Sequence, residues 1–203
     1  SLENYYNPDL LTEVTKRVDK LSKQLYVQSK SFDEVWNLAQ NKNQMLASIP
    51  AIQPVANKDL KRMASGYGMR IHPIYKTAKM HSGMDFTAPV GTEIHATGNG
   101  TVITVGFGDR GYGNHVILNH GFSYQTLYGH MSKIVVRPGQ KLNRGDLIGY
   151  VGNSGTSTGP HLHYEVHKNR NPVNPINFYY NDLTPEEYEH MLELSSKAGQ
   201  SFD

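Results

Sequence analysis

The 203-residue sequence has no cysteine, a single tryptophan and no hydrophobic run long enough to span a membrane. The absence of cysteine excludes disulfides and thiolate chemistry, so any metal site must use histidine, aspartate or glutamate. The sequence also lacks a signal peptide and begins with Ser1 instead of methionine. We therefore expect a processed or truncated piece of a longer, secreted or membrane-anchored parent.

A surplus of charge of either sign is also missing. The 20 Lys and Arg residues nearly balance the 18 Asp and Glu residues, which leaves a formal charge of +2 and a pI near 8.6. Such a mild charge could favour weak attraction to an anionic polymer, but nothing in it indicates a nucleic-acid partner. With 37% hydrophobic residues, the chain can form one domain with extensions, or two small domains.

The first fifty residues follow a helical pattern. Apolar residues recur at alternating intervals of three and four, at Leu11, Val14, Val18, Leu21, Leu25, Phe32, Val35 and Ala39. A capping box at Ser31–Glu34 would start a new helix, so the pattern predicts either one long, broken helix or a helical pair over about 7–48. Two uses of the apolar stripe stay open: packing on the chain's own domain or a second copy, and a coiled coil with a partner.

The rest of the chain predicts a mainly β protein with antiparallel sheets. After a proline-containing linker at 50–64, short apolar runs alternate with Gly, Asn, Asp and Pro over 65–180. Strands are expected at 82–86, 93–96, 100–106, 115–119, 123–128, 147–151 and 161–167. At 181–203, the cap Thr184-Pro185-Glu186-Glu187 predicts a helix from Pro185 to about Lys197. The predicted organisation is thus a helical arm (1–49), a linker, a β domain and a C-terminal helix with a tail.

Two histidine motifs carry the chemistry. In a strand, His161 and His163 point to one face while Leu162, Tyr164 and Val166 point to the other. Upstream, His81 and Asp85 are four residues apart, which places them on one side of a strand or a helical turn. Two imidazoles and a carboxylate suit a catalytic zinc ion that keeps one coordination position for water.

In combination, these motifs resemble the lysostaphin-like zinc peptidases of family M23 (the LytM-domain type), which cut peptide bonds in bacterial peptidoglycan. The resemblance covers roughly 65–178. Its matching motifs are His81-x-x-x-Asp85, Tyr128-Gly129-His130, His161-x-His163, Gly66-Tyr67-Gly68-Met69-Arg70 with His72-Pro73, Pro89-Val90-Gly91-Thr92, Gly113-Asn114-His115-Val116 and Val151-Gly152-Asn153-Ser154-Gly155.

The resemblance implies a barrel-sandwich-like LytM fold and one Zn²⁺ per chain, held by His81, Asp85 and His163. It places His130 and His161 beside the metal. We expect His161 to act mainly as the base and His130 mainly to stabilise the tetrahedral intermediate or transfer protons, although the two roles could be exchanged.

Three further residues are substrate-binding candidates. Arg70 and Asn114 lie in family-like motifs, and a turn role fits each of them equally well; Tyr128 either packs or lines the groove. A surface or structural role is expected for the remaining histidines, His72, His95, His115, His120, His167 and His190. The pairs Tyr5-Tyr6 and Tyr179-Tyr180 are expected to serve packing or anchoring.

Three functional interpretations compete. The first is a zinc endopeptidase acting on stem peptides or cross-links of peptidoglycan, in a periplasmic, membrane-tethered parent. The second is a non-catalytic LytM-like regulator whose helical arm activates another wall hydrolase; such proteins typically lack some metal ligands. The third, a biotinyl or lipoyl carrier, fits the rhythm of the glycine-rich runs but lacks a lysine at a hairpin tip, and we reject it.

Overall fold

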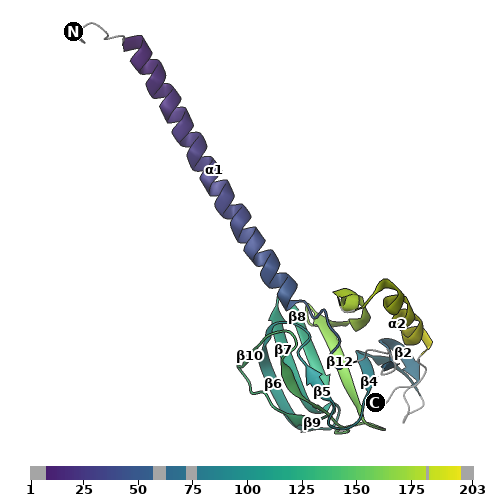
Figure 1. Cartoon of the computed structure of the whole chain (residues 1–203). Helices are drawn as coiled ribbons and strands as arrows, with labels where there is room; N and C mark the ends of the chain where they lie inside the picture. The colour runs from purple at the N-terminus through teal and green to yellow at the C-terminus, as the bar shows by residue number, and fades with distance from the viewer. Residues whose placement is uncertain (1–7, 57–62, 72–76, 182, 198–203) are drawn as a thin grey trace. The chain divides into compact units, whose positions relative to one another are not determined.

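The computed structural model describes residues 8–56, 63–71, 77–181 and 183–197 (Figure 1). The chain divides into two units, Ser1–Gln44 and Met45–Asp203. The domain boundaries expected from the sequence, at residues 50, 65 and 181, stay predictions. His72, Tyr5 and Tyr6 lie outside the described residues.

One continuous helix, α1 (Pro8–Ser48), makes up the described part of the first unit. The expected break at Ser31 is wrong, because inside a continuous helix the backbone N–H groups of a would-be capping box already bond to the preceding turn. The described side chains of the apolar stripe are exposed: Leu21 is 64% exposed and Leu25 is 75% exposed. The coiled-coil interpretation of this stripe gains no support from the described residues. No described helix is long and apolar enough to cross a membrane.

The second unit consists mainly of antiparallel strands, as expected from the sequence. Its larger sheet is curled (Figure 1) and has the strand order β1-β4-β12-β8-β7-β6-β10, with β13 also paired to β12. These strands are β1 (Met63–Ser65), β4 (Met84–Thr87), β6 (Gly100–Asp109), β7 (Gly113–Gly121), β8 (Tyr124–Gly129), β10 (Lys141–Leu142), β12 (His161–Lys168) and β13 (Asn171–Val173).

Two smaller sheets, the end of α1 and two further helical segments complete the described part of the unit. One sheet has the order β5-β11-β9 and the other pairs β2 with β3. Their bounds are β2 (Gly68–Ile71), β3 (Ala78–His81), β5 (Glu93–His95), β9 (Met131–Ile134) and β11 (Leu147–Val151). The 3₁₀ helix η1 (Pro175–Asn181) precedes the helix α2 (Pro185–Lys197).

Local patterns predicted β4 to β8, β11, β12 and α2, but not β1 to β3, β9, β10, β13 or η1. The strand at Leu147–Val151 and the helix at Pro185–Lys197 have the predicted bounds. The predicted capping box also forms: the Thr184 backbone N–H donates to the Glu187 carboxylate at 2.8 Å, and the Glu187 N–H donates to the Thr184 hydroxyl at 3.2 Å. The hairpin after β7 turns later than expected, at Phe122 and Ser123, which both have positive φ.

The described part of the expected linker packs on the β domain. Ala51 and Val55 are buried, and the Ala51 N–H donates to the Thr97 carbonyl at 3.0 Å. Just before this stretch, the Arg144 guanidinium donates to three carbonyl oxygens, those of Leu46 (2.6 Å), Ala47 (3.1 Å) and Ile49 (2.9 Å). An arginine distant in sequence thereby satisfies carbonyls that a helix end leaves without intrahelical partners.

Candidate metal centre

Three buried side chains meet where the end of β3 approaches β4 and β12 of the larger sheet: His81, Asp85 and His163. His81 Nε2 lies 3.0 Å from His163 Nδ1 and 3.1 Å from Asp85 Oδ1, and His163 Nδ1 lies 3.0 Å from Asp85 Oδ1. Three potential ligand atoms from three strands therefore form a nearly equilateral triangle.

Strand register produces this convergence. His163 on β12 pairs directly with Asp85 on β4 on one side and with Gly129 on β8 on the other. His81 ends β3, and the short turn Ser82–Gly83 returns the chain into β4. Gly83 is required in this turn, because a Cβ there would overlap the Tyr164 carbonyl oxygen of β12. The opposite face of β12 packs into the core through Leu162, Tyr164 and Val166, as the alternation predicted.

Neighbouring acceptors determine which ring nitrogens carry protons. His81 Nδ1 lies 2.9 Å from the Gly66 carbonyl oxygen, and His163 Nε2 lies 2.9 Å from Glu165 Oε1. A carbonyl or an ionised carboxylate only accepts, so these nitrogens donate. In the neutral rings, the remaining nitrogens, His81 Nε2 and His163 Nδ1, therefore present lone pairs toward Asp85 Oδ1.

With both rings neutral, a cation fits this arrangement better than a hydrogen-bond pattern. Three acceptor atoms close to one another have no proton to share, and they repel each other unless a positive charge lies between them. Ligand atoms of a tetrahedral zinc site, at bond lengths of about 2.0–2.1 Å, lie about 3.3 Å apart, close to the observed spacing. Asp85 Oδ2 is also buried without a hydrogen-bond partner among the described residues.

The balance of buried charges also favours a bound cation. Asp85 and Glu165 are both almost fully buried, and among the described residues neither carboxylate has a lysine or arginine partner. Buried charges need compensation, and a divalent cation would balance two carboxylates. His81, Asp85 and His163 thus form a donor set suited to a divalent metal ion.

His130 and His161 lie beside this triangle, with ring centroids 4.6 Å apart. His130 Nδ1 donates to the Ser154 carbonyl at 2.7 Å, and His161 Nδ1 donates to the Gly159 carbonyl at 2.8 Å. In the neutral rings, Nε2 is therefore the basic nitrogen of both. His161 Nε2 lies 3.9 Å from Asp85 Oδ1. His130 holds its position with a φ of 58°, at the junction of β8 and β9.

A cluster of donors surrounds Glu165, two residues beyond His163. Its carboxylate accepts hydrogen bonds from His163 Nε2, His167 Nε2, the Ser82 hydroxyl and the Tyr112 hydroxyl. Burial by itself would raise the pKa of Glu165, but the hydrogen bonds from His163 and His167 hold this pKa far below its ordinary value. Burial, together with the negative charge of Glu165, raises the pKa of Tyr112 to about 12, so Tyr112 is a neutral donor.

The three substrate-binding candidates have different surroundings. Tyr128 is fully buried, and its hydroxyl bonds to Thr97 and Thr126, which supports the packing alternative. Asn114 bonds to backbone through both ends of its amide, to Gly108 N–H and the Met131 carbonyl, as a turn role requires. Arg70 lies in β2, opposite Lys79, and its substrate contact stays a prediction.

Of the other described histidines, His190 on α2 is exposed, and the rest bond within the fold. His95 and His115 bond to the carbonyls of Gly145 and Gly113, and His120 is buried. Burial lowers the pKa of His120 to about 4, although its hydrogen bond to Asn99 opposes the shift. His167 bonds to Glu165, a partner that the sequence did not reveal.

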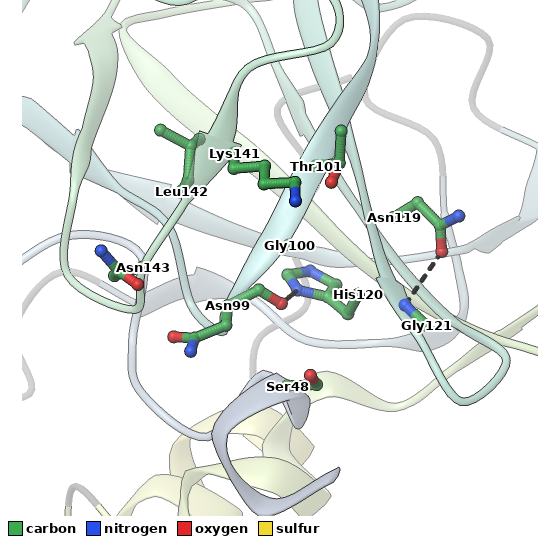
Figure 2. A pocket seen from close by; sticks show the side chains of 10 residues that line it. All are labelled: Ser48, Asn99, Gly100, Thr101, Asn119, His120, Gly121, Lys141, Leu142 and Asn143. Atoms are coloured by element: carbon green, nitrogen blue, oxygen red, sulfur yellow. Dashed lines mark hydrogen bonds between the residues drawn. The ribbon is translucent and has the colours of Figure 1, made fainter. Parts of the chain in front are cut away.

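A separate polar pocket of about 410 Å³ lies around the start of β6 and is lined in part by Asn99, Asn119, His120 and Lys141 (Figure 2). Several of its polar groups already make structural hydrogen bonds: Asn99 with Arg144 and His120, and Asn119 with Gly121. We assign no binding role to this pocket.

Comparison with known proteins finds peptidases similar to this chain. The family model for peptidase family M23 matches residues 79–175. Among curated proteins, the chain is 45% identical over 115 residues to the DD-carboxypeptidase/endopeptidase Mpg of Neisseria meningitidis, and 46% identical over 108 residues to the peptidoglycan DD-endopeptidase ShyA of Vibrio cholerae. The aligned regions cover 57% and 53% of this chain, but only 26% and 25% of those relatives. The chain thus matches about a quarter of their length.

Two solved catalytic domains are matched over nearly their whole length. For the catalytic domain of the M23 protein EnpA from Enterococcus faecalis, the identity is 40% and the TM-score 0.51, covering 56% of this chain and 88% of that domain. For the catalytic domain of lysostaphin from Staphylococcus simulans, the identity is 31% and the TM-score 0.54, covering 62% of this chain and 98% of that domain.

Proposed function

Because the chain belongs to peptidase family M23, we propose that it is a zinc-dependent endopeptidase that hydrolyses peptide bonds in peptidoglycan. The observation that carries this proposal is the triangle of three acceptor atoms at 3.0–3.1 Å, whose protons are directed away by Gly66 and Glu165. A donor set of this kind holds a catalytic metal with a position left for substrate or water.

In this proposal, His81, Asp85 and His163 hold one zinc ion per chain. When bound there, zinc would supply Lewis acidity that polarises the scissile carbonyl and eases the ionisation of water. Two histidine nitrogens and one carboxylate oxygen match the ligand types that zinc takes at catalytic sites.

In this proposal, His161 and His130 serve as the groups that transfer protons and stabilise the oxyanion. His161 presents its basic Nε2 beside the metal centre, at 3.9 Å from Asp85 Oδ1. We assign to His161 the removal of the proton from the attacking water and its later delivery to the leaving amine. His130 in its protonated form would donate a hydrogen bond to the developing oxyanion. The reverse assignment uses the same geometry.

The proposed substrate class follows from the relatives. Mpg is named a DD-carboxypeptidase/endopeptidase and ShyA a peptidoglycan DD-endopeptidase. We therefore propose a cross-link between D-amino acids of neighbouring stem peptides as the bond cleaved. Peptidoglycan lies outside the cytoplasm, and we accordingly propose an extracytoplasmic location, with a membrane tether in a longer parent as part of this hypothesis. The regulatory interpretation is not favoured, because its members typically lack part of the ligand set that is complete here.

Mass analysis of fragments released from purified sacculi tests this function. The wild-type chain should reduce the cross-linked muropeptides and release new termini that identify the bond. The His161→Ala variant and a chelator-treated sample should leave them intact. Bound zinc without any release from sacculi or from soluble cross-linked muropeptides would contradict the endopeptidase function, and the absence of zinc binding would contradict the metal centre itself.

A further inference from the structure

Glu165 lies at the centre of four hydrogen bonds, all of which converge on one buried carboxylate. Oε1 accepts from His163 Nε2 at 2.9 Å, from the Tyr112 hydroxyl at 2.9 Å and from the Ser82 hydroxyl, and Oε2 accepts from His167. The side chain is about 1% exposed. A buried carboxylate with so many donors is held in one position.

The donors reach Glu165 from three separate parts of the fold. Ser82 comes from the turn between β3 and β4, 83 residues before Glu165, and Tyr112 comes from the turn between β6 and β7, 53 residues before it. Only His163 and His167 share its strand, on the same face. The cluster therefore ties both neighbouring turns to the strand that carries a metal ligand.

His163 is the residue on which this cluster acts. Its Nε2–H donates to Glu165, its ring centroid lies 5.6 Å from that of Tyr112, and it meets the His81 ring edge-on at 4.8 Å. Without an acceptor at Nε2, a neutral imidazole can place its proton on either nitrogen. With the proton on Nδ1, the lone pair would point away from Asp85 and His81.

We propose that Glu165 is a positioning residue that keeps the proton of His163 on Nε2 and thereby aims its Nδ1 lone pair into the metal site. Ser82, Tyr112 and His167 hold Glu165 in place for this task. A carboxylate in this position also makes the imidazole a stronger donor to a cation, and loss of such a partner commonly weakens metal affinity about 10- to 100-fold. The proposal rests on the proposed function for the identity of the metal.

Two variants distinguish the effect of the negative charge of Glu165 from the effect of its hydrogen-bond acceptor. Glu165→Ala removes the acceptor altogether, whereas Glu165→Gln keeps an oxygen that can accept from Nε2 but loses the charge. We expect zinc affinity, measured by chelator competition, to fall about 10- to 100-fold in the alanine variant and less in the glutamine variant. Tyr112→Phe, which keeps the ring but loses one donor, should show a smaller loss than the alanine variant.

An exposed Glu–His pair elsewhere in the chain supplies the matched control. Glu93 lies 3.6 Å from His95, its side chain is 60% exposed, and neither residue belongs to the metal centre. Glu93→Ala removes the same charge from the chain without touching His163. Its zinc affinity should equal that of the wild type.

A second readout needs no metal. In the metal-free wild type, at a pH where the His163 ring is neutral, ¹⁵N NMR of the imidazole nitrogens should show His163 protonated on Nε2, with the signal assigned through His163→Gln. In Glu165→Ala the Nδ1–H form should become populated, and in Glu165→Gln the Nε2–H form should persist. A merely structural role for Glu165 would lower thermal stability without changing this tautomer.

The outcomes are distinct. An unchanged tautomer together with an unchanged zinc affinity in Glu165→Ala would overturn the proposal. If that variant does not fold, wild-type zinc affinity in both Glu165→Gln and Tyr112→Phe would overturn it instead. Failure of the wild type to bind zinc would contradict the proposed function, while the tautomer would still decide the role of Glu165.

Discussion

His161 and His163 share one face of β12 but are held by different partners. The His161 ring is anchored through Nδ1 to the Gly159 carbonyl, so its Nε2 faces the site, whereas His163 is anchored through Nε2 and presents Nδ1. Only Nδ1 of His163 belongs to the triangle with His81 and Asp85. The two neighbours are thus fitted for different tasks.

The first prediction separates these tasks. His163→Ala should reduce zinc content from one ion per chain to almost none, because two ligands rarely retain a catalytic zinc. His161→Ala should keep the metal and lose turnover by about 10²- to 10⁴-fold, the usual contribution of a general base. Elemental analysis and muropeptide release measure the two quantities. Full turnover in His161→Ala would contradict its role as a base.

The second prediction concerns pH and His120. Burial, the largest cause, lowers the pKa of His120 to about 4 from an ordinary value of 6.5. Between these values the unfolded chain binds a proton that the folded chain does not. The free energy of unfolding is therefore unaffected by protonation of His120 above about pH 6.5. As the pH falls toward 4, protonation of His120 in the unfolded chain lowers this free energy by about 3 kcal/mol in total.

Urea unfolding of the metal-free protein at several pH values checks this dependence. His120→Gln lacks the titrating group and serves as the reference, because both proteins share every other histidine. The unfolding free energy of the wild type should fall more steeply between pH 6.5 and 4.5 than that of the variant. Equal slopes would show that His120 titrates normally in the folded chain.

At the scale of elements, the turn between β3 and β4 decides how closely two ligand-bearing segments approach β12. A Cβ at Gly83 would overlap the Tyr164 carbonyl oxygen and come within 2.9 Å of the Glu165 side chain. The turn therefore needs glycine because glycine has no Cβ. The atoms of β12 belong to a packed sheet and cannot move away to make room for one.

The third prediction follows from this contact. Gly83→Ala should push the turn away from β12, lowering both the melting temperature and the zinc affinity, since His81 and Ser82 would move together. Gly111→Ala is a suitable control, because a Cβ there meets only the Asp109 carboxylate, at 3.2 Å. Calorimetry and chelator competition measure the two effects. Wild-type values for Gly83→Ala would show that the turn can adjust.

At the scale of the whole molecule, every buried apolar residue of the core cluster and every residue of the metal centre belongs to the unit Met45–Asp203. The described first unit is a helix whose apolar side chains are exposed. Folding energy from apolar burial is therefore concentrated in the second unit.

The fourth prediction is that a fragment comprising residues 45–203 folds and binds one zinc ion with the affinity of the full chain. It should also cleave soluble cross-linked muropeptides at a similar rate. Circular dichroism, chelator competition and chromatography of the products check these points. A loss of zinc binding in the fragment would show that the helix supports the site, and the 203-residue chain serves as the control.

Short-range patterns in the sequence determined a large part of this protein. The alternation at His161–Val166, the strand at Leu147–Val151 and the capping box at Thr184–Glu187 depend on neighbours within a few residues, and the structure has all three. The same alternation places Glu165 on the face of His163, and this signal could have revealed it. The family resemblance, in addition, indicated that His81, Asp85 and His163 would meet at one metal site.

Only the tertiary structure decided which distant groups complete the site. The Gly66 carbonyl reaches His81, and Tyr112 and Ser82 reach Glu165, through pairings that no local pattern encodes. The same holds for the capping of carbonyls near residue 47 by Arg144. Such contacts follow from strand register and close packing across the fold, because a buried donor or acceptor bonds to whichever partner the assembled sheets bring within reach.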